Sequence, residues 1–221
     1  MRWLSLLAFL SAASVAAAQN AALRRECTTA EKCTARGVQY YKGDGVPKDP
    51  AKSAVFYRFG CDEGDVRGCY NLADLYASGT GVKSDNAKAI ELFGKACDKA
   101  FYEGCGRLAL FYRDAIGVTR DERKAVELFQ KGCDSRSMFS CRSLGWMHQE
   151  GRGTTRDAAK AASYYDTACK GGDDWGCGSL GHLHENGEGV KRDAAKAREL
   201  YGIACKAGHA TFCDSLKKMG R

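Results

Sequence analysis

A 36-residue spacing between cysteines constrains this chain more than any other feature. One series is Cys33, Cys69, Cys105, Cys141, Cys177 and Cys213, and the other is Cys61, Cys97, Cys133, Cys169 and Cys205. An internal period of this length is typical of stacked repeats, in which each supersecondary unit buries its apolar face against the next. The period therefore predicts one quasi-linear repeat domain in the 221 residues, rather than one or two globular domains.

Each repeat carries two helical patterns. In the second repeat, apolar residues at positions 69, 72, 73 and 76 form one stripe of a helix from residue 68 to about residue 77. A second stripe, at positions 89, 93, 96 and 97, predicts a helix from residue 86 to residue 98. The chain has only two prolines, which also favours helix. We expect an all-α fold, an α/α superhelical solenoid of five 36-residue helix pairs stapled by disulfides.

Two residue types recur between the paired helices. A glycine after the first helix predicts a left-handed or tightly turned backbone. An aspartate before the second helix predicts an N-cap, whose carboxylate accepts a backbone N–H. Pro50 follows the first such aspartate, and proline favours the first helical position. The positions are Gly45, Gly81, Gly117, Gly153 and Gly189, and Asp49, Asp85, Asp121, Asp157 and Asp193.

The second helix of each repeat has an aromatic residue at one fixed position. Such a stripe could form a ligand-binding site, but its recurrence at the same helical position in every repeat favours core packing. A small residue precedes it by one turn, which lets helices approach closely. The aromatic residues are Tyr57, Phe93, Phe129, Tyr165 and Tyr201, and the small ones are Ser53, Ala89, Ala125, Ala161 and Ala197.

The N-terminus reads as a secretory signal peptide over residues 1–18. Arg2 supplies a positive charge, a short apolar stretch follows, and Ala16 to Ala18 fit a small-residue cleavage site. The stretch is too short and alanine-rich for a membrane anchor, and no later segment is apolar enough to span. Cleavage would lower the formal charge from +7 to +6. We expect a periplasmic or secreted protein.

The repeats set the remaining boundaries. Residues 19–32 would form an N-terminal cap, and residues 213–221 would form a C-terminal capping helix. The five repeats between them are 33–68, 69–104, 105–140, 141–176 and 177–212.

The chain has twelve cysteines, and twelve cysteines in an exported chain predict a disulfide framework. Structural zinc is the alternative, but it usually uses cysteines two to four residues apart, with histidine partners. Here seven residues separate the two cysteines in five of the pairs, and the chain has only four histidines, so we expect no metal and no cofactor. The expected pairs join the end of a second helix to the next repeat: Cys61–Cys69, Cys97–Cys105, Cys133–Cys141, Cys169–Cys177 and Cys205–Cys213, with Cys27–Cys33 at the N-terminal cap.

The fifth repeat, CGSLGHLHENGEGVKRDAAKARELYGIACKAG, resembles the Sel-one-like repeat (SLR) family, and the resemblance covers residues 27 to 218. The C-x7-C in every repeat is similar to the Helicobacter cysteine-rich proteins, a secreted SLR group assigned to a beta-lactamase family. A mitochondrial intermembrane-space SLR protein has the same spacing. The resemblance implies a right-handed superhelix with a groove lined by the first helices. It implies either an adaptor that holds partners or a penicillin-binding protein with weak beta-lactamase activity.

The catalytic alternative requires particular sequence motifs. A serine beta-lactamase needs S-x-x-K, S-D-N and K-T-G elements. The chain contains Ser215-Leu216-Lys217-Lys218 and Ser84-Asp85-Asn86, but no K-T-G. These segments lie three repeats apart, and stacked helices are about 10 Å apart, so we expect no shared pocket and no catalytic residues. His148 and His184 occupy a slot filled by tyrosine in other repeats, which favours packing over ligand binding.

Two positions of the first helix vary freely between repeats. One reads Val38, Asp74, Leu110, Trp146, His182, and the other reads Ala35, Asn71, Arg107, Ser143, Ser179. Together they would line one face of the solenoid, where repeat proteins bind.

An unconstrained surface would vary in the same way, but Trp146 and Leu110 are costly to expose without a use. The predicted binding stripe is Asn71, Asp74, Arg107, Leu110, Trp146 and His182. It suits a protein or extended peptide, or a polar polymer such as peptidoglycan. Charges are interspersed without a basic tract, so we expect no nucleic-acid partner. We expect a monomeric binding scaffold.

Overall fold

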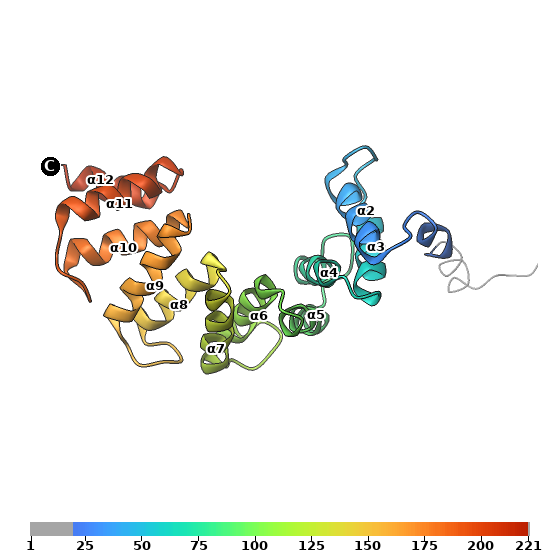
Figure 1. Cartoon of the computed structure of the whole chain (residues 1–221), viewed down its shortest axis with the longest axis horizontal. Coiled ribbons are helices and arrows are strands. Elements are labelled where there is room, and N and C mark those ends of the chain that lie inside the picture. Colours follow the sequence, from blue (N-terminus) through green and yellow to red (C-terminus); the bar gives the residue numbers. More distant parts are fainter. Residues whose placement is uncertain (1–19, 221) are drawn as a thin grey trace, which may run out of the picture. The chain divides into compact units, whose positions relative to one another are not determined.

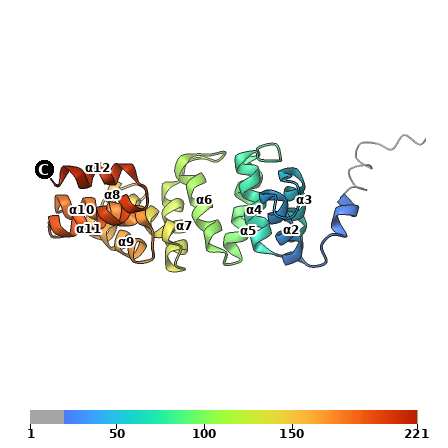
Figure 2. The ribbon, with the colours of Figure 1, turned by 90° about the horizontal axis from the view of Figure 1, so that it is seen from above.

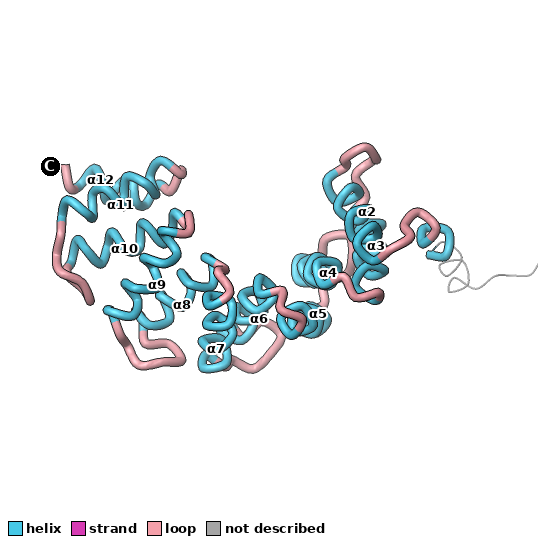
Figure 3. The backbone as a smooth tube through the Cα atoms, viewed as in Figure 1, coloured by secondary structure: helices cyan, strands magenta, loops and turns pink. Residues whose placement is uncertain are grey.

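Residues 20–220 of the chain are described by a computed structural model, and they form helices joined by short loops (Figure 1, Figure 3). No strand occurs within these residues. The predicted signal peptide, residues 1–18, lies outside them. The helices are α2 (Ala30–Lys42), α3 (Pro50–Asp62), α4 (Val66–Ser78), α5 (Asn86–Asp98), α6 (Tyr102–Asp114), α7 (Glu122–Asp134), α8 (Met138–Glu150), α9 (Ala158–Lys170), α10 (Asp174–Asn186), α11 (Ala194–Lys206) and α12 (Ala210–Lys218).

The chain forms two compact units, one ending at Lys95 and one beginning at Ala96, so the boundary lies within α5. In the first unit α2 packs on α3, and α4 packs on both. In the second unit each helix from α6 to α12 packs on the next, and α6 also contacts α8. Figure 2 shows α10, α11 and α12 side by side in this unit. The predicted all-α fold of solenoid-type helix pairs is confirmed. We call the even-numbered helices α2 to α10 helices A and the odd-numbered ones helices B.

The recurring aspartates begin helices B as predicted. Asp49, Asp85, Asp121, Asp157 and Asp193 each accept a backbone N–H from the residue three positions later, at 2.8 to 3.1 Å. Pro50 occupies the first turn of α3. Helix α5 covers residues 86–98, the range expected from its apolar stripe.

Helices A begin earlier than the apolar stripe indicates. In the second repeat α4 starts at Val66, because the Asp65 carboxylate accepts the Arg67 backbone N–H at 3.1 Å. Thr29, Ser137 and Asp173 cap their helices in the same way, but Phe101 does not. The N-cap of helices A was not predicted, because four different residue types occupy this position in the five repeats.

The core consists of the recurring apolar positions. The aromatic residue of each helix B is at most 4% exposed, and the small residue one turn before it is fully buried. The residues at positions 69, 72, 73 and 76 of the second repeat are buried as well. These aromatic side chains therefore pack the core, as predicted.

The recurring loop glycine has the predicted left-handed backbone, with φ of +67° to +71° in all five repeats. The structure adds a second reason for glycine. A Cβ on Gly153 would lie 2.2 Å from the backbone oxygen of Glu122, at the start of the preceding helix B. Gly81 meets Pro50 and Gly189 meets Ala158 at comparable distances. The loop of one repeat thus rests directly on the backbone of the previous repeat.

Six disulfides staple the described residues, and no cysteine among residues 20–220 is free. Five of them join the end of a helix B to the start of the next helix A, with Cα–Cα distances of 4.5 to 4.7 Å. Cys27 and Cys33 form the sixth. The first five are the pairs expected from the 36-residue spacing, and the predicted pairing of Cys27 with Cys33, which lies outside that spacing, is confirmed as well.

Candidate functional site

The six residues of the predicted stripe lie on helices A, and none of them is buried. Asn71 and Asp74 lie on α4 in the first unit and are partly exposed. In the second unit Arg107 and Leu110 lie on α6, Trp146 on α8 and His182 on α10. Arg107 and His182 are exposed, whereas Leu110 and Trp146 are partly covered.

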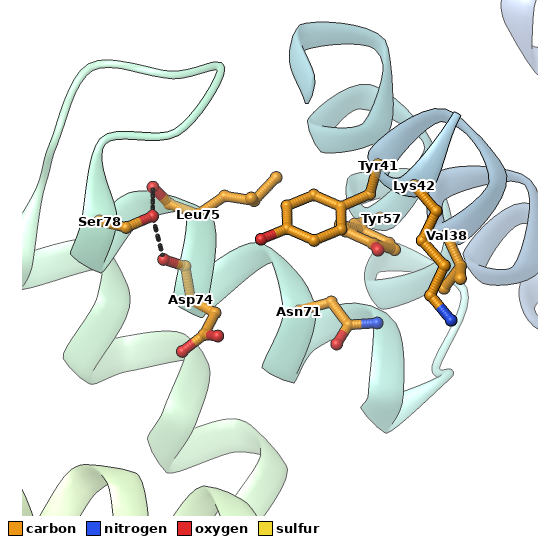
Figure 4. Close-up of a pocket in the computed structure, with 8 residues that line it drawn as sticks. All are labelled: Val38, Tyr41, Lys42, Tyr57, Asn71, Asp74, Leu75 and Ser78. Atoms are coloured by element: carbon orange, nitrogen blue, oxygen red, sulfur yellow. Dashed lines mark hydrogen bonds between the residues drawn. The ribbon is translucent and has the colours of Figure 1, made fainter. Parts of the chain in front are cut away.

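A cavity of about 320 Å³ opens in the first unit, and Asn71 and Asp74 help to line it. Figure 4 shows the Tyr41 ring, from α2, reaching across the cavity toward α4. Ser78 is held on α4 by a bond from its hydroxyl to the Asp74 carbonyl at 2.9 Å. We call this the first cavity; its lining is Val38, Tyr41, Lys42, Tyr57, Asn71, Asp74, Leu75 and Ser78.

A second cavity, of about 430 Å³, lies wholly within the second unit, and Trp146 lines it. Its wall comes from helices A, one helix B and the last helix of the chain. We call it the tryptophan cavity; its lining is Arg113, Asp114, Arg142, Ser143, Trp146, Tyr165, Trp175, Ser179 and Phe212.

The two cavities use equivalent repeat positions, although each belongs to a different unit. A shift of two repeats, 72 residues, matches Tyr41 with Arg113, Lys42 with Asp114, Asn71 with Ser143 and Asp74 with Trp146. These helix-A positions line both cavities with side chains of different chemistry, while the tryptophan cavity extends further, onto α9, α10 and α12. Tyr57 lines the first cavity and Tyr165 the tryptophan cavity, and burial raises the pKa of both above the ordinary value of 10.

Two arginines flank the Trp146 ring. The guanidinium carbons of Arg113 and Arg152 lie 5.3 Å and 5.2 Å from its centroid, within cation–π distance. Arg113 also donates two hydrogen bonds to Asp114, at 2.8 and 2.7 Å. These hydrogen bonds, together with the charges of Arg113 and Arg152, lower the pKa of the Asp114 carboxyl. The pair is therefore ionised at neutral pH and fixes one wall of the tryptophan cavity.

Residues that the sequence comparison missed complete this wall. Trp175 is 45% exposed, and its ring lies 5.4 Å from that of Phe212 on α12. Arg142 is held by an ion pair with Asp173 at 3.0 Å. A signal for Trp175 was available, because its position reads Glu31, Arg67, Glu103, Phe139 and Trp175 in successive repeats and varies as freely as the predicted stripe.

The remaining stripe residues lie outside the lining of both cavities. Arg107 and Leu110 are on α6 of the second unit, and His182 contacts Asn186 one turn further along α10. Their role in binding stays a prediction.

His148 packs in the core of the second unit, as its tyrosine-like position predicts. It is 6% exposed, and its ring stacks on that of Tyr164 at 5.5 Å between centroids. Burial, followed by the charge of Lys160, lowers the pKa of His148 below its ordinary value of 6.5. His184 is only partly buried and contacts the Lys191 carbonyl at 3.3 Å.

This histidine should make the stability of the second unit pH-dependent. The unfolded chain binds the His148 proton at a higher pH than the folded chain, so stability is lost as the pH falls below about 6.5. Replacing His148 with Tyr, the residue at positions 40, 76 and 112, should reduce the fall in melting temperature between neutral and mildly acidic buffer. The exposed His182→Tyr variant should keep the wild-type fall. Equal falls in wild type and His148→Tyr would contradict the prediction.

The beta-lactamase-like motifs have structural explanations. The Asp85 carboxylate caps α5 by accepting the Lys88 N–H at 3.1 Å, and the Ser215 hydroxyl donates to the Thr211 carbonyl at 3.3 Å.

Residues 20–220 hold no group of three or more histidine, cysteine or acidic side chains placed to bind a metal ion. No described helix has the length and apolar character needed to cross a membrane.

Comparison with known proteins identifies the repeat family to which the chain belongs. The model described as Sel1 repeat matches residues 34–65, 66–101, 103–137, 139–173 and 177–209. A comparison with curated proteins found no match.

Several solved structures are similar. A protective antigen of uropathogenic Escherichia coli with an SLR fold is 29% identical, with a TM-score of 0.79, covering 85% of this chain and 40% of that one. A Sel1 repeat protein from Oxalobacter formigenes is 25% identical, with a TM-score of 0.83, covering 86% and 78%. Helicobacter pylori cysteine-rich protein B is 28% identical, with a TM-score of 0.49, covering 62% and 99%. The chain thus spans less than half of the E. coli protein.

Proposed function

The chain belongs to the Sel1 repeat family, and we propose that it is an exported scaffold that binds an extended peptide segment of another protein through its helices A. Sel1 repeats generally mediate protein interactions. The two cavities carry the proposal, since each unit forms one at equivalent helix-A positions and fills it with different side chains. A conserved framework with variable lining is how repeat proteins adapt one fold to different ligands.

The disulfides support the exported location. All cysteines of the described residues are paired, and disulfides persist in oxidising compartments such as the periplasm or the exterior. The signal-peptide pattern of residues 1–18 points the same way. We propose that the mature protein acts there as a monomer, and that peptidoglycan is the alternative ligand of the same face.

Partner capture tests the function. Oxidised protein carrying Trp146→Ala and Arg107→Ala together should no longer retain the partner that the wild type retains from an extracytoplasmic extract. Arg107 is exposed, but Trp146 packs partly against the core of the second unit, so the double variant is assayed below the midpoint of its own melting curve. Capture by the double variant at wild-type level would rule out the helix-A face.

Photo-cross-linking in cells makes this test site-specific. A photoreactive phenylalanine at Arg107, on helix A, should yield adducts with another protein, whereas one at the exposed Arg123, on helix B, should not. Equal adducts at both positions would argue against the proposal.

Turnover of a chromogenic cephalosporin by the purified protein would instead support the beta-lactamase alternative, for which the geometry of Ser84, Asp85 and Ser215 offers no support.

A further inference from the structure

The tryptophan cavity collects the two tryptophans of the described residues. Three tryptophans occur in the chain, and the other is Trp3, within the predicted signal peptide. Trp146 and Trp175 lie on successive helices A, α8 and α10, with Phe212 beside Trp175. Tryptophan and arginine are the residues most enriched at binding hot spots, where an anchor side chain enters a desolvated pocket.

The size of the cavity suits a side chain together with a short piece of backbone. Its volume of about 430 Å³ is within the range of small-ligand sites. Nearly half of Trp175 is exposed, although the His209 ring lies beside it, at 4.6 Å between centroids. Trp146, by contrast, is partly covered and flanked by Arg113 and Arg152, so Trp175 is the surface on which a ligand ring can stack.

The guanidinium groups of the lining favour an acidic group, because each keeps unfilled N–H donors beside the one carboxylate that it already binds. Two arginines and one aspartate line the tryptophan cavity, whereas the first cavity has one lysine and one aspartate. Asp114 engages Nε and Nη2 of Arg113, and Asp173 engages Nε of Arg142. Each guanidinium has five N–H donors, so Nη1 of Arg113 and the Nη groups of Arg142 can still bind a ligand. A carboxylate matches that planar donor set.

We propose that the tryptophan cavity is an anchor site for an acidic peptide segment of the partner protein. A large apolar or aromatic side chain of the peptide stacks on Trp175 and Phe212, and a neighbouring carboxylate binds Arg113 and Arg142. The lining of the first cavity has one lysine and no arginine, and so lacks this planar donor set. This inference rests on the proposed function, because it names the chemistry of the segment that one unit of the scaffold recognises.

The two tryptophans provide a direct readout. The oxidised mature chain is titrated with a synthetic peptide of alternating glutamate and phenylalanine, and its intrinsic fluorescence is followed. We expect a saturable change that weakens at high salt, because the contacts are partly ionic. A peptide with glutamine for glutamate, and another with serine for phenylalanine, should each bind at least about tenfold more weakly, a loss of about 1.4 kcal/mol.

Variants locate the site. Arg113→Gln combined with Arg142→Gln should weaken the acidic aromatic peptide at least about tenfold. Arg123→Gln removes one such charge from an exposed position on α7, outside the cavity, and should leave the affinity within about twofold of wild type. Trp175→Phe should leave Trp146 as the remaining reporter of binding. Melting curves establish that each variant is folded, and the peptide comparisons on the wild type require no variant.

The outcomes separate this site from the wider function. The site is refuted if the serine peptide binds as tightly as the phenylalanine peptide, if Arg123→Gln weakens binding as much as the double variant, or if no saturable change occurs. Partner adducts at Arg107 together with any of these results would leave the scaffold function standing and overturn only the acidic-aromatic anchor. Absence of both adducts and peptide binding would overturn both proposals.

Discussion

Reduction of the disulfides is expected to unfold this protein or to lower its melting temperature sharply. Five of the six bonds close a loop of about nine residues, and each such loop restricts the unfolded chain by roughly 2.5 kcal/mol. Four of the bonds lie in the second unit. Their summed contribution, about 10 kcal/mol, is comparable with the whole stability of a typical domain, about 5–15 kcal/mol.

The reason lies in the repeat architecture. Each helix packs mainly on its neighbours in sequence, so long-range contacts do not tie the ends of a unit together. The disulfides fix the connection at which one helix pair meets the next. Without them, that connection depends on helix packing alone.

Circular dichroism melts with and without a phosphine reductant measure this effect, and the same reductant on a cysteine-free helical-repeat protein is the control. Thiol titration of the unfolded, unreduced mature protein should find almost no free thiols. A reduced protein that melts within a few degrees of the oxidised one would disprove the staple role.

Gly153→Ala is expected to destabilise the second unit by about 2–4 kcal/mol. The left-handed backbone at this residue costs alanine about 1 kcal/mol, and the methyl group would lie 2.2 Å from the Glu122 oxygen. Backbone oxygen cannot move aside as a flexible side chain can, so overpacking adds about 1–3 kcal/mol.

A matched control lies in the same unit. Gly172 also has a positive φ, but a Cβ there would meet nothing within 4 Å. Equivalent positions hold Ala100 and Arg136, also with positive φ (62° and 64°), so Gly172→Ala should cost about 1 kcal/mol. Urea denaturation of both variants gives the comparison. Equal losses would mean that only backbone strain acts at Gly153, and that its contact with the preceding repeat has no energetic role.

Most of the fold could be predicted because the same local sequence signals recur in each repeat. Asp85 before α5, the glycine at position 81 and the aromatic at position 93 each act through neighbours within one or two helices, and recurrence separates them from chance. Helix A starts were missed because Thr29, Asp65, Phe101, Ser137 and Asp173 share a position without sharing a chemistry.

The candidate site was predicted only in part. Variation between repeats identified Trp146, Asn71 and Asp74 as surface positions, and these three line cavities. Arg113 and Phe212 could not be assigned in this way, because their contribution depends on how α6 and α12 approach α8 and α10 within the second unit.

The sequence by itself determined the helix-pair repeat, its caps and its disulfide pairs, since a 36-residue period imposes the same local geometry on every copy. Only the tertiary structure decided which variable residues meet. The side chains of Arg113, Trp146, Trp175 and Phe212 come from four helices, and helix packing brings them into one cavity. The loop glycine shows the same division, because its left-handed turn is local, whereas its contact with Glu122 exists only once the preceding repeat packs against it.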